Sequence, residues 1–199
     1  IYRGLVGSEM CIRDRLEPNS ISSYYGISYN KIKLKQFQGA IDNYLNALNL
    51  EDLENDDKYY ILKTIGATYN FGLNEFKNSK KYLQDAIDLN AENSNAYLEM
   101  GDLFAKNNEN KKALEYYNKA IEVDSSDTPI YYRSIFYYRT GQYDLAFEDV
   151  KKVRNIDPTN PGSYYLDFLL NSRLNKIKAF SDITLAIEKY KDGLEEDNS

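Results

Sequence analysis

The sequence has 199 residues and a net charge of −6, with 42% hydrophobic and 28% charged residues. This balance is typical of a globular chain, and its acidity argues against nonspecific binding to nucleic acid or to anionic membranes. No apolar run approaches the roughly 20 residues that a membrane-spanning helix needs, so we expect no membrane span in the sequence.

The stretch LVGSEMCIRDR, from Leu5 to Arg15, differs in composition from the Tyr-, Asn- and Lys-rich sequence after it. Charged residues interrupt its apolar runs, which excludes a secretory signal. It contains Cys11, the only cysteine of a chain without histidine, so a paired-ligand metal or redox site is also excluded. The stretch resembles the translation of a transposase-type sequencing-library adapter. We therefore expect residues 1–15 to be non-native and the true N-terminus to be missing, the alternative being a frayed N-terminal arm.

The sequence from Leu16 onward repeats one plan, in which a helix, a short polar turn and a second helix follow each other. Segments 95–124 and 129–158 align at a spacing of 33 residues, and segment 61–90 has the same plan. Apolar residues within each second helix recur at helical spacing. The pattern predicts an all-α solenoid in residues 16–194, with about five antiparallel helix pairs and a frayed tail at 195–199. The expected pairs are 19–50, 57–90, 94–123, 128–156 and 161–194.

Small residues recur where the two helices of a pair should meet, because helices approach closely only where facing side chains are small. A pair cannot bury both its faces alone, so stacked neighbours must complete the core. In the fifth pair Ala179 and Ala186 hold the equivalent positions of the second helix. The other expected packing residues are Gly66, Ser79, Ala86, Gly101, Ala113, Ala120, Ser134 and Ala146.

These residues resemble the tetratricopeptide repeat family, over roughly residues 20–194. The family pattern has a small residue midway along the first helix, a following aromatic, an aromatic that opens the second helix, and a terminal Asp-Pro. Asn110 departs from this pattern at the second-helix opening, and only Asp157-Pro158 keeps the terminal pair. The other aromatic positions read Tyr69, Phe104 and Tyr137 in the first helices and Phe37, Phe76 and Tyr143 in the second.

The resemblance implies a concave face lined by the first helices, on which a peptide or protein segment binds. The alternative is that several of its tyrosines simply pack between repeats. Tyr25 and Tyr29 stand where a clamp for chaperone C-termini has Lys and Asn, and Glu99 would repel a carboxylate, so we do not expect such a clamp. The expected groove residues are Tyr25, Tyr29, Tyr60, Lys63, Asn95, Leu98, Asp102, Tyr131, Ile135, Tyr138 and Tyr164.

The sequence offers no constellation of catalytic residues, and we expect no enzyme, no cofactor and no metal. Histidine is absent, and Cys11 belongs to the stretch expected to be non-native. The acidic run 51–57 lacks the spaced ligands, central glycine and final glutamate of a calcium loop, so we interpret it as a solvated connection. No glycine-rich phosphate loop is present.

The main functional hypothesis is therefore a noncatalytic scaffold or adaptor that binds another protein or a peptide in the concave groove. The first alternative is a regulatory or docking arm of a larger enzyme whose catalytic domain lies upstream. The second is self-association through the end repeats. Abundant Asn, Lys, Ile and Tyr suggest an AT-rich genome, and we expect a bacterial fragment located in the cytoplasm or the periplasm.

Overall fold

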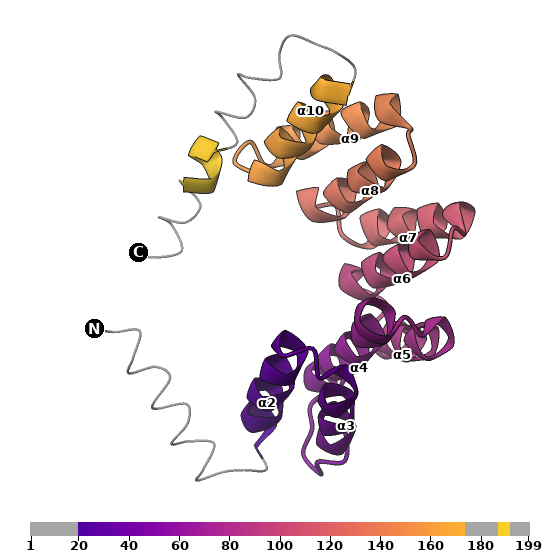
Figure 1. Cartoon of the computed structure of the whole chain (residues 1–199), viewed down its shortest axis with the longest axis vertical. Coiled ribbons are helices and arrows are strands. Elements are labelled where there is room, and N and C mark those ends of the chain that lie inside the picture. Colours follow the sequence, from indigo (N-terminus) through magenta and orange to yellow (C-terminus); the bar gives the residue numbers. More distant parts are fainter. Residues whose placement is uncertain (1–19, 174–186, 192–199) are drawn as a thin grey trace. The chain divides into compact units, whose positions relative to one another are not determined.

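The computed structural model describes residues 20–173 and 187–191, and all regular structure in these ranges is helical, which confirms the predicted class (Figure 1). The chain divides into two compact units, unit 1 (Ile1–Ala91) and unit 2 (Glu92–Ser199), which we describe separately. Unit 1 contains α2 (Ile21–Lys33), α3 (Phe37–Ala47), α4 (Asn55–Thr68), η1 (Tyr69–Leu73) and α5 (Phe76–Leu89). Unit 2 contains α6 (Ser94–Lys106), α7 (Asn110–Val123), α8 (Asp127–Arg139), α9 (Tyr143–Ile156) and α10 (Pro161–Arg173), followed by a short helix at 187–191.

Some expectations fall outside the described residues. They are the non-native segment 1–15, the packing residues Ala179 and Ala186, and the tail 195–199. The fifth pair is thus described only by α10 and by the helix at 187–191.

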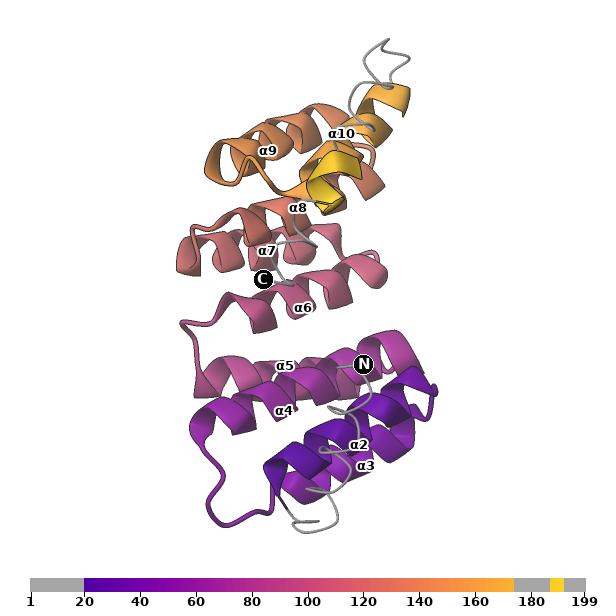
Figure 2. The ribbon, with the colours of Figure 1, turned by 90° about the vertical axis from the view of Figure 1, so that its left-hand side faces the viewer.

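Four hairpins, α2–α3, α4–α5, α6–α7 and α8–α9, form the body of the two units (Figure 2). Each hairpin turn contains one residue with a positive φ, two positions before the second helix starts. This left-handed residue reverses the chain, and it is a glycine in only one of the four turns. The four residues are Lys35, Asn74, Asn108 and Gly141.

Small buried residues allow the paired helices to approach. A Cβ added to Gly66 would lie 2.6 Å from Cγ of Leu83, and one added to Gly101 would lie 2.7 Å from the ring of Tyr117. Real Cβ atoms do not approach other atoms so closely, so these two glycines set the helix separation in their hairpins. The expected packing residues are all buried: Gly66, Ser79, Ala86, Gly101, Ala113, Ala120, Ser134 and Ala146.

The core of unit 1 lies between the α2–α3 hairpin and α4. Ile41 and Tyr44 from α3 pack with Ile61 and Ile65 from α4, and all four are at most 1% exposed. Leu53, in the connection between the hairpins, closes this cluster. The connection thus places an apolar side chain in the core although its neighbours are acidic.

Helix α4 ends in a π-helical turn, η1, because its hairpin contains one residue more than the others. The buried small residues of the first and second helices are 19 positions apart in Ser28–Ala47 and in Gly101–Ala120. In Gly66–Ala86 they are 20 positions apart. A π turn holds one more residue per turn than an α turn. It therefore keeps Asn74 at the left-handed position before α5.

Gly72 allows this wider turn to pack against the preceding hairpin. A Cβ at Gly72 would lie 2.6 Å from the ring of Phe37, the residue that opens α3. The neighbouring Phe71 is 61% exposed. The extra residue thus brings one aromatic side chain to the surface at the end of α4.

A buried ion pair links three helices of unit 2. The guanidinium of Arg133 donates from Nε and Nη2 to both carboxylate oxygens of Asp149, at 2.7 and 2.8 Å. Its Nη1 donates to Oδ1 of Asn118 at 2.7 Å, which joins α8 to α7 as well as to α9. Asp149 is only 2% exposed, so it depends on these donors and on Lys152, whose Nζ lies 3.0 Å away.

The connection between α9 and α10 shifts the register of α10 by one residue. Asn160 caps α10, since its Oδ1 accepts from the backbone N–H of Ser163 at 2.9 Å. The N-terminal cap of α8 is Ser126, 34 residues earlier, whereas the cap of α6 is Asn93, only 33 residues before Ser126. Tyr165, and not Tyr164, therefore occupies the α10 position that corresponds to Tyr131 in α8.

Candidate functional site

The first helices of the unit 1 hairpins present a tyrosine-rich surface. We define the unit 1 A-face by Tyr25, Tyr29 and Lys33 on α2 and by Tyr60 and Lys63 on α4. The rings of Tyr25 and Tyr60 meet edge to face with centroids 4.9 Å apart, which joins the two helices. Tyr29 is 58% exposed and Tyr60 is 43% exposed, so both present ring surface to solvent.

Tyr25 has a structural part within this face. Its hydroxyl donates to Oδ1 of Asp57 at 2.6 Å, and its ring lies 6.3 Å from that of the buried Tyr44. Burial raises the pKa of Tyr25, and the hydrogen bond to Asp57 and the charge of that carboxylate raise it further. Burial likewise raises the pKa of Tyr44. Tyr25 therefore remains a protonated donor that fixes α2 to α4.

Two lysines of the unit 1 A-face lie over tyrosine rings. Nζ of Lys33 is 5.2 Å from the ring centroid of Tyr29, and Nζ of Lys63 is 5.2 Å from that of Tyr60. Such cation–π contacts are worth about 0.5–1 kcal/mol at exposed sites. Among the ion pairs within residues 20–173 and 187–191, none includes either lysine. Both ammonium groups are therefore held in place without a carboxylate partner.

Helices α6 and α8 form the corresponding surface of unit 2. We define the unit 2 A-face by Asp102, Tyr131, Tyr132, Ile135 and Tyr138. Asp102 accepts a hydrogen bond of 2.6 Å from the hydroxyl of Tyr117. Burial raises the pKa of Asp102, and this hydrogen bond and the charge of Arg139 partly offset the increase. Tyr132 is 39% exposed, and after burial the charges of Glu99 and Asp102 raise its pKa, which places both carboxylates beside it.

Four tyrosines converge at the end of unit 2. The ring of Tyr131 packs on Gly162 of α10, where an added Cβ would lie 2.5 Å from the ring. Burial raises the pKa of Tyr131, and the neighbouring hydroxyls of Tyr190, Tyr132 and Tyr165 contribute. Tyr190 belongs to the helix at 187–191, which Figure 2 shows in front of α8 and α10.

The remaining expected groove residues differ in their placement. Asn95 is exposed at the start of α6, whereas Leu98 is 4% exposed and belongs to the core. Ile135 and Tyr138 are half-buried on α8, and the ring of Tyr138 lies 5.8 Å from that of Tyr143. The structure thus assigns Leu98 to packing within unit 2 rather than to its surface.

Tyr164 lies apart from the other tyrosines of the unit 2 A-face. Its ring packs under the guanidinium of Arg154, 4.2 Å from the centroid, and its hydroxyl donates to the carbonyl oxygen of Pro158. It therefore supports the connection between α9 and α10. The sequence reasoning missed Tyr132 and Tyr165. Counting the extra residue before the Asn160 cap identifies Tyr165.

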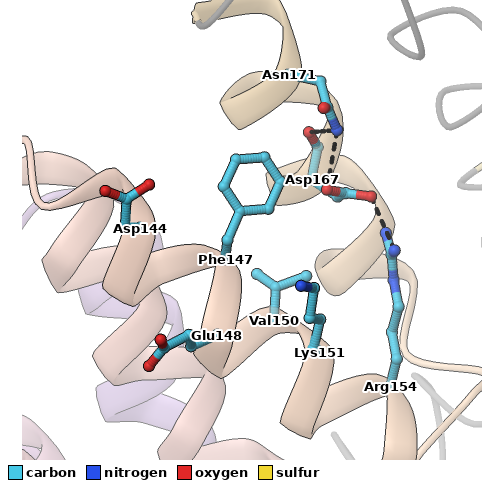
Figure 3. A pocket seen from close by; sticks show the side chains of 8 residues that line it. All are labelled: Asp144, Phe147, Glu148, Val150, Lys151, Arg154, Asp167 and Asn171. Carbon is cyan, nitrogen blue, oxygen red and sulfur yellow. Dashed lines mark hydrogen bonds and ion pairs between the residues drawn. The ribbon is translucent and has the colours of Figure 1, made fainter. Parts of the chain in front are cut away.

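A pocket of about 510 Å³ opens between α9 and α10 (Figure 3). Phe147 and Val150 supply its apolar side chains. Nη1 of Arg154 lies 2.8 Å from Oδ2 of Asp167, and Asn171 donates to the same carboxylate through Nδ2. The other lining residues are Asp144, Glu148 and Lys151, so charges of both signs surround the opening.

Neither a metal centre nor a membrane span is found in the part of the chain that the structure describes. No group of three or more Cys, Asp or Glu residues there could hold a metal ion. No described helix has the length and apolar character needed to cross a bilayer.

Comparison with known proteins identifies the repeat. Residues 94–127 match the family described as tetratricopeptide repeat. A TPR repeat-containing protein of Methanocaldococcus jannaschii is 28% identical over 179 residues, which are 86% of this chain and 29% of that protein. BBSome complex member BBS4 of Bos taurus is 26% identical over 177 residues, which are 88% of this chain and 32% of that protein. The chain thus spans about a third of the length of these relatives.

Solved structures share the fold. The crystal structure of MamA is 21% identical and has a TM-score of 0.61, with 85% of this chain and 97% of that chain covered. The crystal structure of YrrB, a TPR protein with an unusual peptide-binding site, is 19% identical, with a TM-score of 0.53 and coverage of 93% and 94%. At these identities the likeness concerns the fold alone.

The helical hairpins, their small interhelical residues and their left-handed turns define an α-solenoid of stacked helix pairs. The chain is a tetratricopeptide-repeat protein, as the match over 94–127 and the relatives show.

Proposed function

We propose that this chain is a noncatalytic protein-interaction scaffold whose A-faces bind a segment of a partner protein. The observation that carries the proposal is the unit 1 A-face, where Tyr29 and Tyr60 are about half-exposed beside two lysines without a carboxylate partner. Tyrosine offers a large contact area at a low entropic cost. The peptide-binding site named for YrrB supports a peptide-binding use of this fold.

Site-specific photocrosslinking tests the proposal. The photoreactive residue p-benzoylphenylalanine would replace Tyr29 or Tyr132 on the A-faces, or Leu145, which is 40% exposed on the second helix α9, as the control. Each protein is irradiated in cell extract and the adducts are identified by mass spectrometry. We expect a shared partner at Tyr29 or Tyr132 and none at Leu145. A partner that crosslinks equally at all three positions contradicts binding on the A-faces.

A second candidate function is a docking or regulatory arm of a larger enzyme. A UDP-N-acetylglucosamine–peptide N-acetylglucosaminyltransferase of Giardia intestinalis is 32% identical over 65 residues, which are 32% of this chain and 4% of that protein. Sequencing the gene across the junction near Leu16 tests this candidate. A catalytic domain in the same reading frame would favour the arm, whereas further repeats would favour the scaffold.

A further inference from the structure

We propose that the unit 1 A-face selects an acidic partner segment that carries an aromatic or aliphatic side chain between its carboxylates. This inference rests on the proposed function and names the ligand chemistry of one of its two surfaces. It follows from the placement of cations, carboxylates and exposed rings around α2 and α4.

The cations come first. Lys33 and Lys63 lie on neighbouring helices, and each ammonium is held 5.2 Å from a tyrosine centroid. Other lysines of the chain are already neutralised, since Lys112 pairs with Glu109 at 2.6 Å and Lys152 with Asp149 at 3.0 Å. Lys33 and Lys63 thus offer two positive charges to carboxylates that come from outside.

The carboxylates of unit 1 do not compete for these charges. Asp57 is occupied by the hydroxyl of Tyr25. Asp56 is exposed in the first turn of α4, seven residues before Lys63, which corresponds to about 10 Å along the helix axis. Attraction over such a distance is largely screened by physiological salt. A segment that lies along the face therefore meets its positive charges at Lys33 and Lys63.

The apolar surface between and beyond the lysines is aromatic. Tyr29, Tyr60 and Phe71 are 58%, 43% and 61% exposed. Tyr60, Lys63, Ala67 and Phe71 recur at intervals of three and four residues, so they follow one helical face. The π turn that absorbs the extra residue of this hairpin brings Phe71 to the end of that face. Turns of this kind occur frequently at functional sites.

The unit 2 A-face has the opposite charge and would not hold the same ligand. Glu99 and Asp102 lie beside the exposed Tyr132. Carboxylates of a partner segment would be repelled there. The selectivity is therefore assigned to unit 1 and can be tested within one chain.

The test uses random 12-residue peptides displayed on phage and selected on the immobilised full chain. We expect the selected peptides to contain more Asp and Glu than Lys and Arg, relative to the unselected library, together with an aromatic or aliphatic residue. Synthetic copies are then titrated against K33Q/K63Q and against K81Q. The last is the matched control, because Lys81 lies 5.1 Å from the ring of Tyr82 on the second helix α5.

Affinity for the acidic peptides should fall by about three- to tenfold in K33Q/K63Q, the effect expected for two partly exposed ion pairs, and should stay unchanged in K81Q. Neutral or basic selected peptides, failure to select any, or equal affinities for wild type and K33Q/K63Q would overturn the inference. Neutral peptides that still crosslink at Tyr29 would leave the proposed function intact while removing the acidic preference.

Discussion

At the scale of single residues, Gly101 and Tyr117 show how one contact serves both packing and polarity. The glycine lets the tyrosine ring cross α6, and the ring then carries its hydroxyl to Asp102, 2.6 Å away. Any side chain at position 101 would push the ring outward. The half-buried carboxylate would then lose its donor, and a buried polar group without a partner destabilises the native state.

Gly101→Ala should lower the free energy of unfolding by about 1–3 kcal/mol, because its Cβ overlaps the ring of Tyr117. Urea unfolding followed by circular dichroism measures this change. Gly39→Ala is the control, since the nearest atom to its added Cβ lies at 3.6 Å, an ordinary contact. That variant should gain up to about 1 kcal/mol from the better helix propensity of alanine. Equal effects of the two substitutions would contradict the close approach at Gly101.

Tyr117→Phe should raise the pKa of Asp102, because the lost hydrogen bond is one of the interactions that offset its burial. A carboxyl group whose folded pKa is raised stabilises the fold below its unfolded pKa, and this stability is lost as the pH rises through the folded pKa. In Tyr117→Phe the loss should extend to a higher pH than in wild type. NMR titration of the Asp102 carboxyl carbon, with Tyr116→Phe as control, measures the shift. An unchanged or lower pKa in Tyr117→Phe would contradict this role of the hydroxyl.

The small residues of the hairpins could be predicted from sequence, because close helix packing leaves a repeating spacing such as Ala113 to Ala146. The hydrogen bond from Tyr117 to Asp102 could not, since it depends on where a ring crosses the facing helix. Leu98 shows the same limit, because burial by neighbouring elements does not follow from its position in the repeat.

At the scale of elements, the α4–α5 hairpin differs from the others through one inserted residue. The spacing of 20 between Gly66 and Ala86 was visible in the sequence, but several geometries could have absorbed it. The structure places it in η1, where Gly72 meets the ring of Phe37. The register of α10 likewise depended on one residue before Asn160. Single insertions of this kind shift which side chains share a face, and periodicity alone does not locate them.

Deletion of Phe71 should restore the spacing of the other hairpins and be tolerated. We expect the free energy of unfolding to change by less than about 1 kcal/mol, near the range for exposed positions. Deletion of Lys106, at the end of α6, removes a residue from a hairpin without an extra one and should cost more than about 3 kcal/mol, because buried side chains rotate out of place. Urea unfolding of both variants tests the comparison. Equal losses would mean that η1 is not the site of the insertion.

The pairing of α8 with α9 depends on the ion pair of Arg133 and Asp149. Arg133→Met should cost about 3–5 kcal/mol, because Asp149 is buried and keeps only Lys152, whose side chain is half-exposed. Adding Asp149→Leu should recover most of the loss, since an apolar pair can replace a buried ion pair. A double-mutant cycle from thermal or urea unfolding measures the coupling. Additive losses would show that the two charges do not depend on each other.

At the scale of the whole molecule, the sequence predicted an all-α solenoid and the structure confirms it, because each repeat carries its own packing pattern. The non-native origin of residues 1–15 stays a prediction, as does the second helix of the fifth pair, which is described only at 187–191. The division into two compact units could not be predicted, because the same repeat pattern runs through residues 61–90 and 95–124 on either side of the boundary.

The two units should open separately, because each buries its own core. Ile41 and Ile65 are fully buried in unit 1, and Met100 and Leu103 are fully buried in unit 2. Ala113→Leu should wedge α6 from α7 and cost about 1–3 kcal/mol, the usual range for overpacking at a site without exposed surface. Stability in repeat proteins is approximately a sum of local and neighbouring terms, so amide hydrogen exchange should accelerate in α6–α9 far more than in α2–α4. Ala40→Leu, at an equally buried position of α3, should give the reverse pattern. Equal acceleration in both units by either substitution would show that the chain unfolds as one cooperative body.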